Sequence, residues 1–571
     1  MKRTFAMIAA LTMVLSLASC GSDGKTSSTP ESSTPASSST PAASTPADND
    51  GEVPYLGEVE VYNAEAANVG LCTGWMPDYI RESAGVDMIG IAKEDGKFEL
   101  MVTAGSLPDV TIIDGVDNLN YAIDAGLLID LSTVMEKLPN LTKYEENDSM
   151  MQYVRDNCSS GTGGLYGLNR MYSESEIADM DVGGIFLRYD YFGDVGYPEL
   201  KNTDDLLDAL KAMQDAHPTT DDGKKIYGMS IFPDWDSATL GVSGYMARSM
   251  GYNFGLVDRD YHEYQGTNDA GKIIFRGITD NDSGYKKFLK FMFKANQMGL
   301  LDPDSMTQTF DDSKAKTASG RSLLSFDNWG TEYSAEDQAN GIGFRRVPLT
   351  GDPYVADDCS PCPGGTHTFV TISKDCKNVD AACALINLMY DPEFTVTYMN
   401  GRRGEVWDQK EDGTPYMVEG GYEARANLDF NKRGCLVMLT YHFSAPLPGF
   451  NGYSTDYTLW PTQPWTPEDN QLVKNWKEHT VNGSFTAYGY MKSIDQYVVP
   501  PAVKAIVLDD ETKMLEDRLK DVMKTANWKL VMAANEAEFE SIWAETAETL
   551  NGIGLDKYVE TWTETYRNAL Y

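Results

Sequence analysis

Strand-like and helix-like segments alternate along the chain, and this alternation limits the possible folds more than any other feature of the sequence. Short β-branched or alternating runs indicate strands at 58–62, 109–113, 184–189 and 227–232. Helical patterns separate them at 119–128 and at a stretch that Thr203 is predicted to cap, with Leu206, Leu207, Leu210 and Met213 on one face. Strands that alternate with helices build parallel sheets covered by helices on both faces. The sequence therefore predicts an α/β fold.

The second half of the chain continues this pattern and then changes. Buried strands are predicted at 322–326, 341–347 and 369–373, followed by a helix at 379–389. From about residue 390 to Pro500-Pro501 the chain reads as loop-rich and aromatic. Beyond that point it reads as helical, with Phe539, Ile542, Trp543 and Leu550 on one stripe behind an Asn535 cap and Glu538. We assign Trp543 and Trp562 to the core because they lie on helical stripes.

Length and charge set further limits. A chain of 571 residues exceeds what one hydrophobic core usually organises, so at least two lobes are expected. Apolar residues make up 42% of the chain, which indicates a globular protein. The formal net charge is -39, which repels phosphate backbones and makes nucleic acid an unlikely partner.

The N-terminus has the features of an export signal. Lys2 and Arg3 precede an apolar run from Phe5 to Leu17 that is short for a membrane span of about 20 residues. The sequence Leu-Ala-Ser-Cys-Gly at 17–21 resembles the bacterial lipobox, which predicts a signal peptide at 1–19 and a lipid anchor on Cys20. Ordinary signal cleavage beside an incidental cysteine is the alternative. The lipobox predicts an extracytoplasmic protein anchored to the cell membrane by lipid.

The segment after Cys20 reads as a flexible tether. Residues 21–50 contain nine Ser, five Thr and four Pro and almost nothing apolar, so they cannot bury enough surface to fold. We assign 20–53 to the lipidated cysteine and this tether.

Several segments, in order along the chain, resemble the family 1 extracellular solute-binding proteins of ABC importers, particularly the long lipoproteins of sugar uptake. The resemblance rests on Ala-Gly-Ser-Leu-Pro-Asp-Val at 104–110, Gly-Leu-Leu-Ile-Asp-Leu at 126–131, Gly-Leu-Tyr-Gly-Leu at 164–168 with Asn169 where proline is usual, 186–206, 372–374, 390–393, Gly-Arg-Arg-Gly-Glu-Val-Trp at 401–407, and 540–566. Each motif is weak alone, and their order carries the assignment.

The resemblance implies a two-lobed, type II periplasmic-binding-protein-like α/β fold with the ligand between lobes joined by crossing strands. It implies an N-terminal lobe from 54–165 plus 310–366 and a C-terminal lobe from 166–309 plus 367–571. Strand ends and helix N-termini converge at such an interlobe site, which makes it suitable for ligand binding.

Enzyme and metal motifs are weak. The chain has five His and lacks the zinc-protease, nucleophile-elbow and phosphate-loop motifs. Asp260-Tyr261-His262-Glu263 could supply metal ligands, but a solvated turn is favoured. A carboxylate pair at glycosidase spacing is expected by chance among 86 acids, so the sequence alone leaves that chemistry open.

The cysteines and one acidic loop also favour simple interpretations. Cys359 and Cys362 form a C-x-x-C, but Cys376 and Cys383 are spaced too widely for a zinc ribbon. Seven thiols remain after lipidation, and most are expected to be buried. The loop at 221–225 lacks the alternating acids of a calcium loop. No metal or cofactor is expected.

Aromatic residues beside polar ones are the most informative candidates. Sugars present C–H faces that stack on an indole and hydroxyls that need planar donors and acceptors. The pairs Asp327 with Trp329 and Asp234 with Trp235 resemble stacking positions of sugar-binding relatives on opposite lobes. Further ligand contacts are predicted at Trp75, which follows the first strand, and at Asp114, Asp117 and Asn118, which follow the strand at 109–113, where relatives of the family have polar ligand contacts. Core packing is the alternative for each tryptophan.

These observations lead to a function hypothesis. We expect a monomeric, lipid-anchored receptor that captures a carbohydrate, in particular an oligosaccharide, and delivers it unaltered to an ABC permease by hinged lobe closure. A binding protein for a peptide or other polar solute is a second hypothesis, and a surface glycan-active enzyme is a third.

Overall fold

The computed structural model describes residues 53–570 except 65–67, 95, 145, 171–182, 235–237, 239, 241–243, 262–272, 329–330, 332, 352, 357–361, 363, 366, 431–446, 448, 456, 458–459, 461–469, 485 and 505. Cys20, the tether, Trp235 and Trp329 therefore lie outside the described residues. In the part that is described, no helix combines the length and the apolar character needed to span a membrane.

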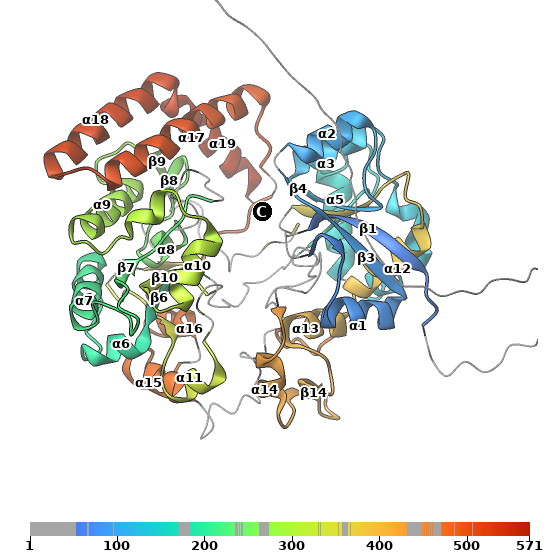
Figure 1. The fold of residues 1–571 in the computed structure, drawn as a ribbon. Helices are drawn as coiled ribbons and strands as arrows, with labels where there is room; N and C mark the ends of the chain where they lie inside the picture. The colour runs from blue at the N-terminus through green and yellow to red at the C-terminus, as the bar shows by residue number, and fades with distance from the viewer. Residues whose placement is uncertain are drawn as a thin grey trace, which may run out of the picture. The chain divides into compact units, whose positions relative to one another are not determined.

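A six-stranded sheet organises the first part of the chain (Figure 1). In spatial order its strands are β2 (Gly70–Leu71), β3 (Val86–Ala92), β1 (Gly57–Ala64), β4 (Val110–Asp114), β13 (Thr368–Ile372) and β5 (Leu168–Asn169). β1 pairs in parallel with β3 and β4, as predicted, whereas β2 runs antiparallel to β3, so the sheet is mixed. β13 runs antiparallel to β4 and β5, with Thr368 opposite Asp114.

Helices and one hairpin pack with this sheet. They are α1 (Trp75–Ala84), α2 (Lys97–Ala104), α3 (Val116–Asp124), η2 (Leu131–Lys137), α4 (Pro139–Thr142), α5 (Glu146–Asn157), α12 (Val379–Met389), α13 (Pro392–Asn400), the hairpin β14 (Trp407–Gln409) and β15 (Pro415–Met417), and α14 (Gly421–Ala426). Their buried side chains form one hydrophobic cluster that extends from Val59 to Leu168 and from Phe369 to Trp460. The apolar positions of β4 and β13 are almost all fully buried because helices cover this sheet.

A four-stranded sheet organises the second cluster. Its order is β11 (Phe344–Arg346), β6 (Gly183–Arg188), β10 (Ser322–Asp327) and β7 (Tyr227–Met229). β10 is parallel to β7 and antiparallel to β6. Two small pairs accompany it, β8 (Val257–Tyr261) with β9 (Ile273–Gly277) and β12 (Tyr354–Val355) with β16 (Tyr497–Val498).

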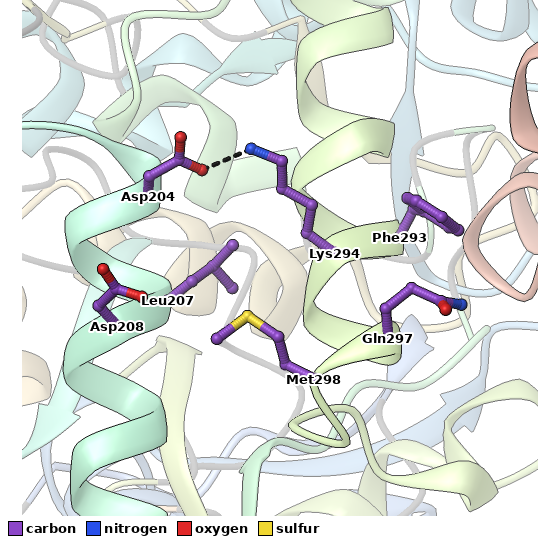
Figure 2. A pocket seen from close by; sticks show the side chains of 7 residues that line it. All are labelled: Asp204, Leu207, Asp208, Phe293, Lys294, Gln297 and Met298. Carbon is purple, nitrogen blue, oxygen red and sulfur yellow. Dashed lines mark hydrogen bonds and ion pairs between the residues drawn. The ribbon is translucent and has the colours of Figure 1, made fainter. Parts of the chain in front are cut away.

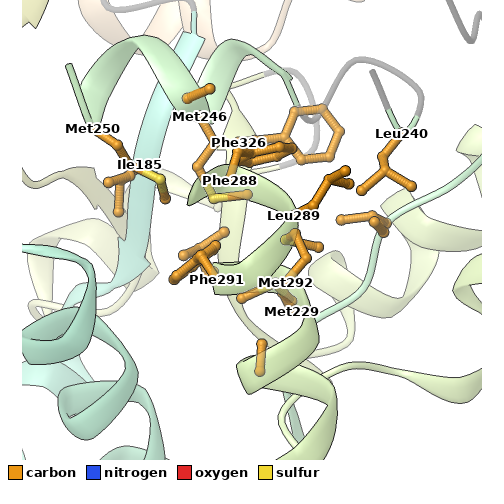
Figure 3. Packing of buried hydrophobic residues seen from close by; sticks show 14 of the residues in the cluster. Ile185, Met229, Leu240, Met246, Met250, Phe288, Leu289, Phe291, Met292 and Phe326 are labelled. Carbon is orange, nitrogen blue, oxygen red and sulfur yellow. The ribbon is translucent and has the colours of Figure 1, made fainter. Parts of the chain in front are cut away.

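The helices of this second group are more numerous. They are α6 (Tyr189–Asp194), α7 (Thr203–Ala216), α8 (Gly244–Ser249), α9 (Gly284–Gln297), η5 (Pro303–Met306), α10 (Phe310–Ala318), α11 (Ala335–Ala339), α15 (Gln471–His479), α16 (Ala487–Ser493), α17 (Asp510–Val531), α18 (Glu536–Ile553) and α19 (Leu555–Ala569). Figure 3 shows part of their core, where Phe288, Leu289 and Met292 of α9 lie near Met229 and Phe326 from the sheet strands. Close packing of such aromatic and methionine side chains fixes α9 to the sheet.

Strand pairing corrects part of the predicted lobe boundaries. Residues 310–366 were predicted to join the N-terminal lobe, but β10 and β11 pair with β6 and lie in the second cluster. Residues 367–571 were predicted to join the C-terminal lobe, but β13 pairs with β4, and residues 369–460 contribute to the first cluster. A hydrophobic pattern shows that a strand is buried but does not show which sheet contains it.

Three local predictions have clear outcomes. Asn202 caps α7 in place of Thr203, because its side chain accepts from the backbone N–H groups of Asp204 and Asp205. Residues 390–500 contain α13, α14, α15 and α16 and so are less loop-rich than expected. The Asn535 cap on α18 is confirmed, and Trp543 is buried in the second cluster, whereas Trp562 is only partly buried against that cluster.

Candidate functional site

Charged and polar side chains gather at one edge of the six-stranded sheet. Lys93 follows β3, Asp114 ends β4, and Arg170 follows β5. These three strands run in the same direction, so their carboxyl ends meet at one edge. Thr368 opens the antiparallel strand β13 and is therefore at the same edge, opposite Asp114. We call Lys93, Asp114, Asn118, Arg170 and Thr368 the first edge group.

Asp114 is the centre of this group. Its Oδ2 lies 2.5 Å from Nζ of Lys93, and its Oδ1 accepts a 3.2 Å hydrogen bond from the hydroxyl of Thr368. Its backbone oxygen accepts a 2.9 Å hydrogen bond from the side-chain amide of Asn118. Three segments distant in sequence are thereby held together around one carboxylate.

Arg170 contributes a second cation that is partly buried. Burial lowers the pKa of its guanidinium, while the negative charge of Asp114 and the Tyr398 phenol oppose this lowering. Its backbone N–H donates to the carbonyl of Thr368 at 3.2 Å, which fixes it beside β13. The group therefore combines ammonium, guanidinium and amide donors with carboxylate and hydroxyl acceptors, the set that a polyhydroxyl ligand requires.

Asp117, another predicted contact, lies in the first turn of α3. The helix follows Gly115, whose φ of 86° is readily adopted only by glycine. Gly115 N–H donates to the carbonyl of His367 at 2.8 Å, which ties the start of α3 to β13. The carboxylate of Asp117 forms an ion pair with Lys513 of α17.

Two predicted acids of the second sheet share an edge in the same manner. Asp327 ends β10, and Asp234 lies shortly beyond the end of the parallel neighbour β7. The rings of Phe326 and Phe232, which precede them, are 5.6 Å apart. Parallel strands therefore bring these two acids to one edge, which we call the second edge group.

Asp234 and Asp327 have structural roles in addition to any contact with a ligand. Asp234 Oδ2 accepts a 2.8 Å hydrogen bond from the backbone N–H of Phe310, the first residue of α10. Asp327 is buried, with 3% of its surface exposed. Asp234 fastens its loop to a helix N-terminus, where the helix dipole favours a negative charge.

Trp75 begins α1 and is half-buried. Its indole N–H donates to the carbonyl of Asp429 at 3.2 Å, and its ring meets Phe430 edge-on with centroids 5.7 Å apart. Trp235 and Trp329, the two predicted stacking residues, lie outside the described residues, so their role stays a prediction.

Two surface cavities in the described part are not lined by any of the predicted ligand contacts. One cavity of about 410 Å³ lies between α7 and α9 (Figure 2). Leu207, Phe293 and Met298 line it, and an ion pair of 2.6 Å joins Asp204 to Lys294. The other, of about 610 Å³, lies beside α19. Neither is lined by a residue of the two edge groups.

The candidate metal sites of the sequence have ordinary contacts where they are described. Asp222 forms a 2.9 Å ion pair with Lys224 and accepts from Thr220, and these bonds lower its pKa to about 2. Cys359 and Cys435 lie outside the described residues, as do His262 and Glu263. The described residues hold no cluster of three or more His, Cys, Asp or Glu suited to a metal.

Four of the described cysteines, Cys158, Cys362, Cys376 and Cys383, are free thiols. The Sγ of the fifth, Cys72, donates to the carbonyl of Asn68 at 3.4 Å. Burial raises the pKa of Cys158 to about 12 and those of Cys362 and Cys376 to about 11. These thiols stay protonated at neutral pH and are poor nucleophiles.

Sequence reasoning missed Lys93, Arg170 and Thr368. Asp114 was predicted because it follows the strand at 109–113, where relatives of the family have polar contacts; Lys93 follows β3 in the same way, but no strand was predicted at 86–92. Arg170 follows the segment 164–168, which was noted only as a motif. Thr368 precedes the predicted strand 369–373, and only the antiparallel direction of β13 brings it to this edge.

The chain matches the sequence pattern of a known family. The sequence pattern of the bacterial extracellular solute-binding proteins matches residues 90–395, more than half of the chain. The chain belongs to this family. The match spans β4, β10 and β13, and so includes strands of both sheets and the residues of both edge groups. Comparison with curated protein sequences gives no match.

Solved structures of solute-binding proteins share the fold. An HMO-binding, ABC-transporter-associated solute-binding protein from Bifidobacterium longum infantis is 18% identical, with 90% of this chain and 99% of that chain covered and a TM-score of 0.52. FusA, an ABC-transporter substrate-binding protein of S. pneumoniae solved in complex with kestose, is 15% identical, with 90% of this chain and 99% of that chain covered and a TM-score of 0.54. The alginate-binding protein AlgQ2 without calcium is 12% identical, with 90% of this chain and 98% of that chain covered and a TM-score of 0.55. The chain therefore has the type II fold of periplasmic binding proteins.

Proposed function

We propose that this solute-binding protein captures a carbohydrate, in particular an oligosaccharide, outside the cytoplasm and delivers it unaltered to an ABC permease. The observation that carries the proposal is the first edge group, where Lys93 and Thr368 both bind the carboxylate of Asp114 at the edge formed by the carboxyl ends of β3, β4 and β5. Ligands of open α/β sheets bind at this kind of edge.

The pairing of charges favours a neutral ligand rich in hydroxyls. Lys93 is neutralised by Asp114, and Lys513 is neutralised by Asp117. Each hydroxyl of a sugar both donates and accepts hydrogen bonds. It can therefore accept from the ammonium and donate to the carboxylate of such an ion pair without leaving either charge unpaired. The remaining cation of the group, Arg170, is partly buried within the field of the Asp114 charge, and its guanidinium can donate to a sugar hydroxyl.

The names of the structural relatives agree with a carbohydrate. One relative is described as HMO-binding, and another was solved with kestose. We extend this ligand class to the present chain as part of the proposal.

We propose that the ligand contacts come from both sheets. Asp114, Asp117, Asn118 and Trp75 would supply contacts from the first sheet, and Asp234, Trp235, Asp327 and Trp329 from the second. The two indoles would stack on sugar rings. Contacts from both lobes would stabilise a closed form that the permease recognises.

We propose that a diacylated Cys20 anchors the protein and that residues 21–50 act as the tether. The lipobox-like sequence and the Ser-, Thr- and Pro-rich composition of the following residues support this proposal.

A thermal-shift screen over mono- and oligosaccharides, amino acids and peptides tests the ligand class. A ligand at 100 times its dissociation constant adds roughly 2.7 kcal/mol to the free energy of unfolding. Stabilisation by saccharides alone supports the proposal, and stabilisation by peptides alone contradicts it. Recovery of the bound saccharide as products in excess of the protein would instead favour an enzyme.

Two variants test whether saccharide binding depends on the first edge group. Asp114→Ala should weaken saccharide binding because it releases Lys93 and Thr368. Asp380→Ala is the matched control, because Asp380 forms an ion pair with Lys137 at the start of α12, which follows the opposite end of β13. Equal affinities in the two variants would show that the first edge group is not the binding site.

A further inference from the structure

An aromatic cluster lies beside Trp75, formed by the N-terminus of α1 and the region around α14. Besides Trp75 it contains Phe430, Tyr457 and Tyr422, with Arg425 among them. Figure 1 shows α13 beside α1, and the rings of Tyr79 in α1 and Phe394 in α13 are 6.4 Å apart. We call Trp75, Arg425, Phe430 and Tyr457 the Arg425 stack.

Arg425 is at the centre of this stack. Its guanidinium carbon is 4.8 Å from the ring centroid of Phe430 and also 4.8 Å from that of Tyr457. Its Nη2 donates a long hydrogen bond of 3.4 Å to the carbonyl of Met399, and its buried Nε has no partner among the described residues. The described residues offer this guanidinium no ion pair, so most of its hydrogen-bonding capacity is unused.

The stack is held in place by polar contacts to its neighbours. The indole of Trp75 binds the carbonyl of Asp429, and the backbone N–H of Tyr457 donates to Asn400 at 3.4 Å. Trp75, Phe430 and Tyr457 are only partly buried, and Tyr422 is 41% exposed. A fixed and exposed group of aromatic rings is a common mark of a binding surface.

The topology brings the stack toward the same sheet edge as the first edge group. Trp75 begins α1, which leads back to the start of β3 at Val86, so the N-terminus of α1 lies toward the carboxyl ends of β1 and β3. β1 separates β3 from β4, which places the ends of these two strands about 10 Å apart. A ligand bound at Asp114 has to extend along the edge to reach Trp75.

We infer that the Arg425 stack is an outer subsite for an additional sugar ring of an oligosaccharide. The partly exposed aromatic faces would stack on the C–H face of the ring, and the guanidinium would donate to its oxygens. This inference rests on the proposed carbohydrate function and adds to it a dependence on ligand length.

A length series tests the inference. The wild type, Trp75→Ala and Arg425→Met are titrated calorimetrically with xylo-, cello- and fructo-oligosaccharides of two to six units. Arg403→Met is the matched control, because Arg403 also lies over an indole, 5.6 Å from Trp407, but that tryptophan is fully buried and unavailable to a ligand.

We expect the affinity of the wild type to rise with the length of the saccharide. For the longer saccharides, each stack variant should bind about tenfold more weakly than the wild type, whereas the affinity for the shortest saccharide that binds should be unchanged. Arg403→Met should follow the wild type. Equal loss at every length, or no loss at any length, would overturn the subsite and leave the carbohydrate function standing. Failure of every saccharide to bind the wild type would contradict the proposed function itself.

Discussion

A buried ion pair behind the second edge group gives the sharpest stability prediction. Nζ of Lys316 in α10 is 2.6 Å from Oδ2 of Asp302, whose side chain is 1% exposed. The same carboxylate accepts a 2.8 Å hydrogen bond from Ser230. Lys316→Met would leave this buried carboxylate without its cation, and such a loss costs about 3 to 5 kcal/mol of unfolding free energy.

Asp304 provides the matched control. It also pairs with Lys316, at 2.8 Å, but its side chain is 66% exposed. Water replaces a lost partner at an exposed site, so Asp304→Ala should cost about 0 to 1 kcal/mol. A double variant, Asp302→Asn with Lys316→Met, should be more stable than Lys316→Met alone, because a neutral amide needs no counter-charge.

Urea denaturation followed by circular dichroism measures the three free energies. Losses below about 1 kcal/mol in both single variants would show that water reaches Asp302, and the argument from burial would fail. The outcome bears on the candidate site because Lys316 lies in α10. This helix begins at Phe310, whose backbone N–H donates a hydrogen bond to the carboxylate of Asp234.

Three further predictions follow from other features. Trp329→Ala should weaken saccharide binding by about 1 to 4 kcal/mol with little change in melting temperature, whereas a core tryptophan such as Trp543 should cost about 3 to 5 kcal/mol of stability; calorimetry with thermal melting separates the two. Burial lowers the pKa of His367 to about 4, so from about pH 6.5 down to about pH 4 the unfolded chain binds the proton first and stability falls, by up to about 3 kcal/mol; His367→Asn should flatten this part of the pH profile in urea titrations. Cys20→Ala should move the protein from the membrane fraction to the medium or periplasm, and retention after a carbonate wash would contradict the anchor.

Much of the fold could be predicted because its signals are local. The β-branched run at 109–113 became β4, and the cap at Asn535 became the start of α18, since side-chain periodicity and capping depend on a few neighbouring residues. The shift of the α7 cap from Thr203 to Asn202 shows the limit of this reasoning. Both residue types cap helices, and the choice depended on the bonds to Asp204 and Asp205.

The candidate site could be predicted only in part. Asp114 was predicted because it follows a strand at a position where relatives have polar ligand contacts, and this inference needs no knowledge of sheet order. Arg170 and Thr368 were not found, because their approach to Asp114 depends on β13 lying between β4 and β5. Arg425 stands 350 positions after Trp75, and no periodic pattern joins them.

The sequence by itself determined the α/β class, the family resemblance, and the predicted export signal and tether, because composition, periodicity and motif order belong to the chain alone. The tertiary structure decided which strands share a sheet, and so moved β10 to the second cluster and β13 to the first. It also decided the partners of Asp114 and Arg425. Long-range pairing depends on the direction and order of strands that are distant in sequence, and a local hydrophobic pattern carries no information about either.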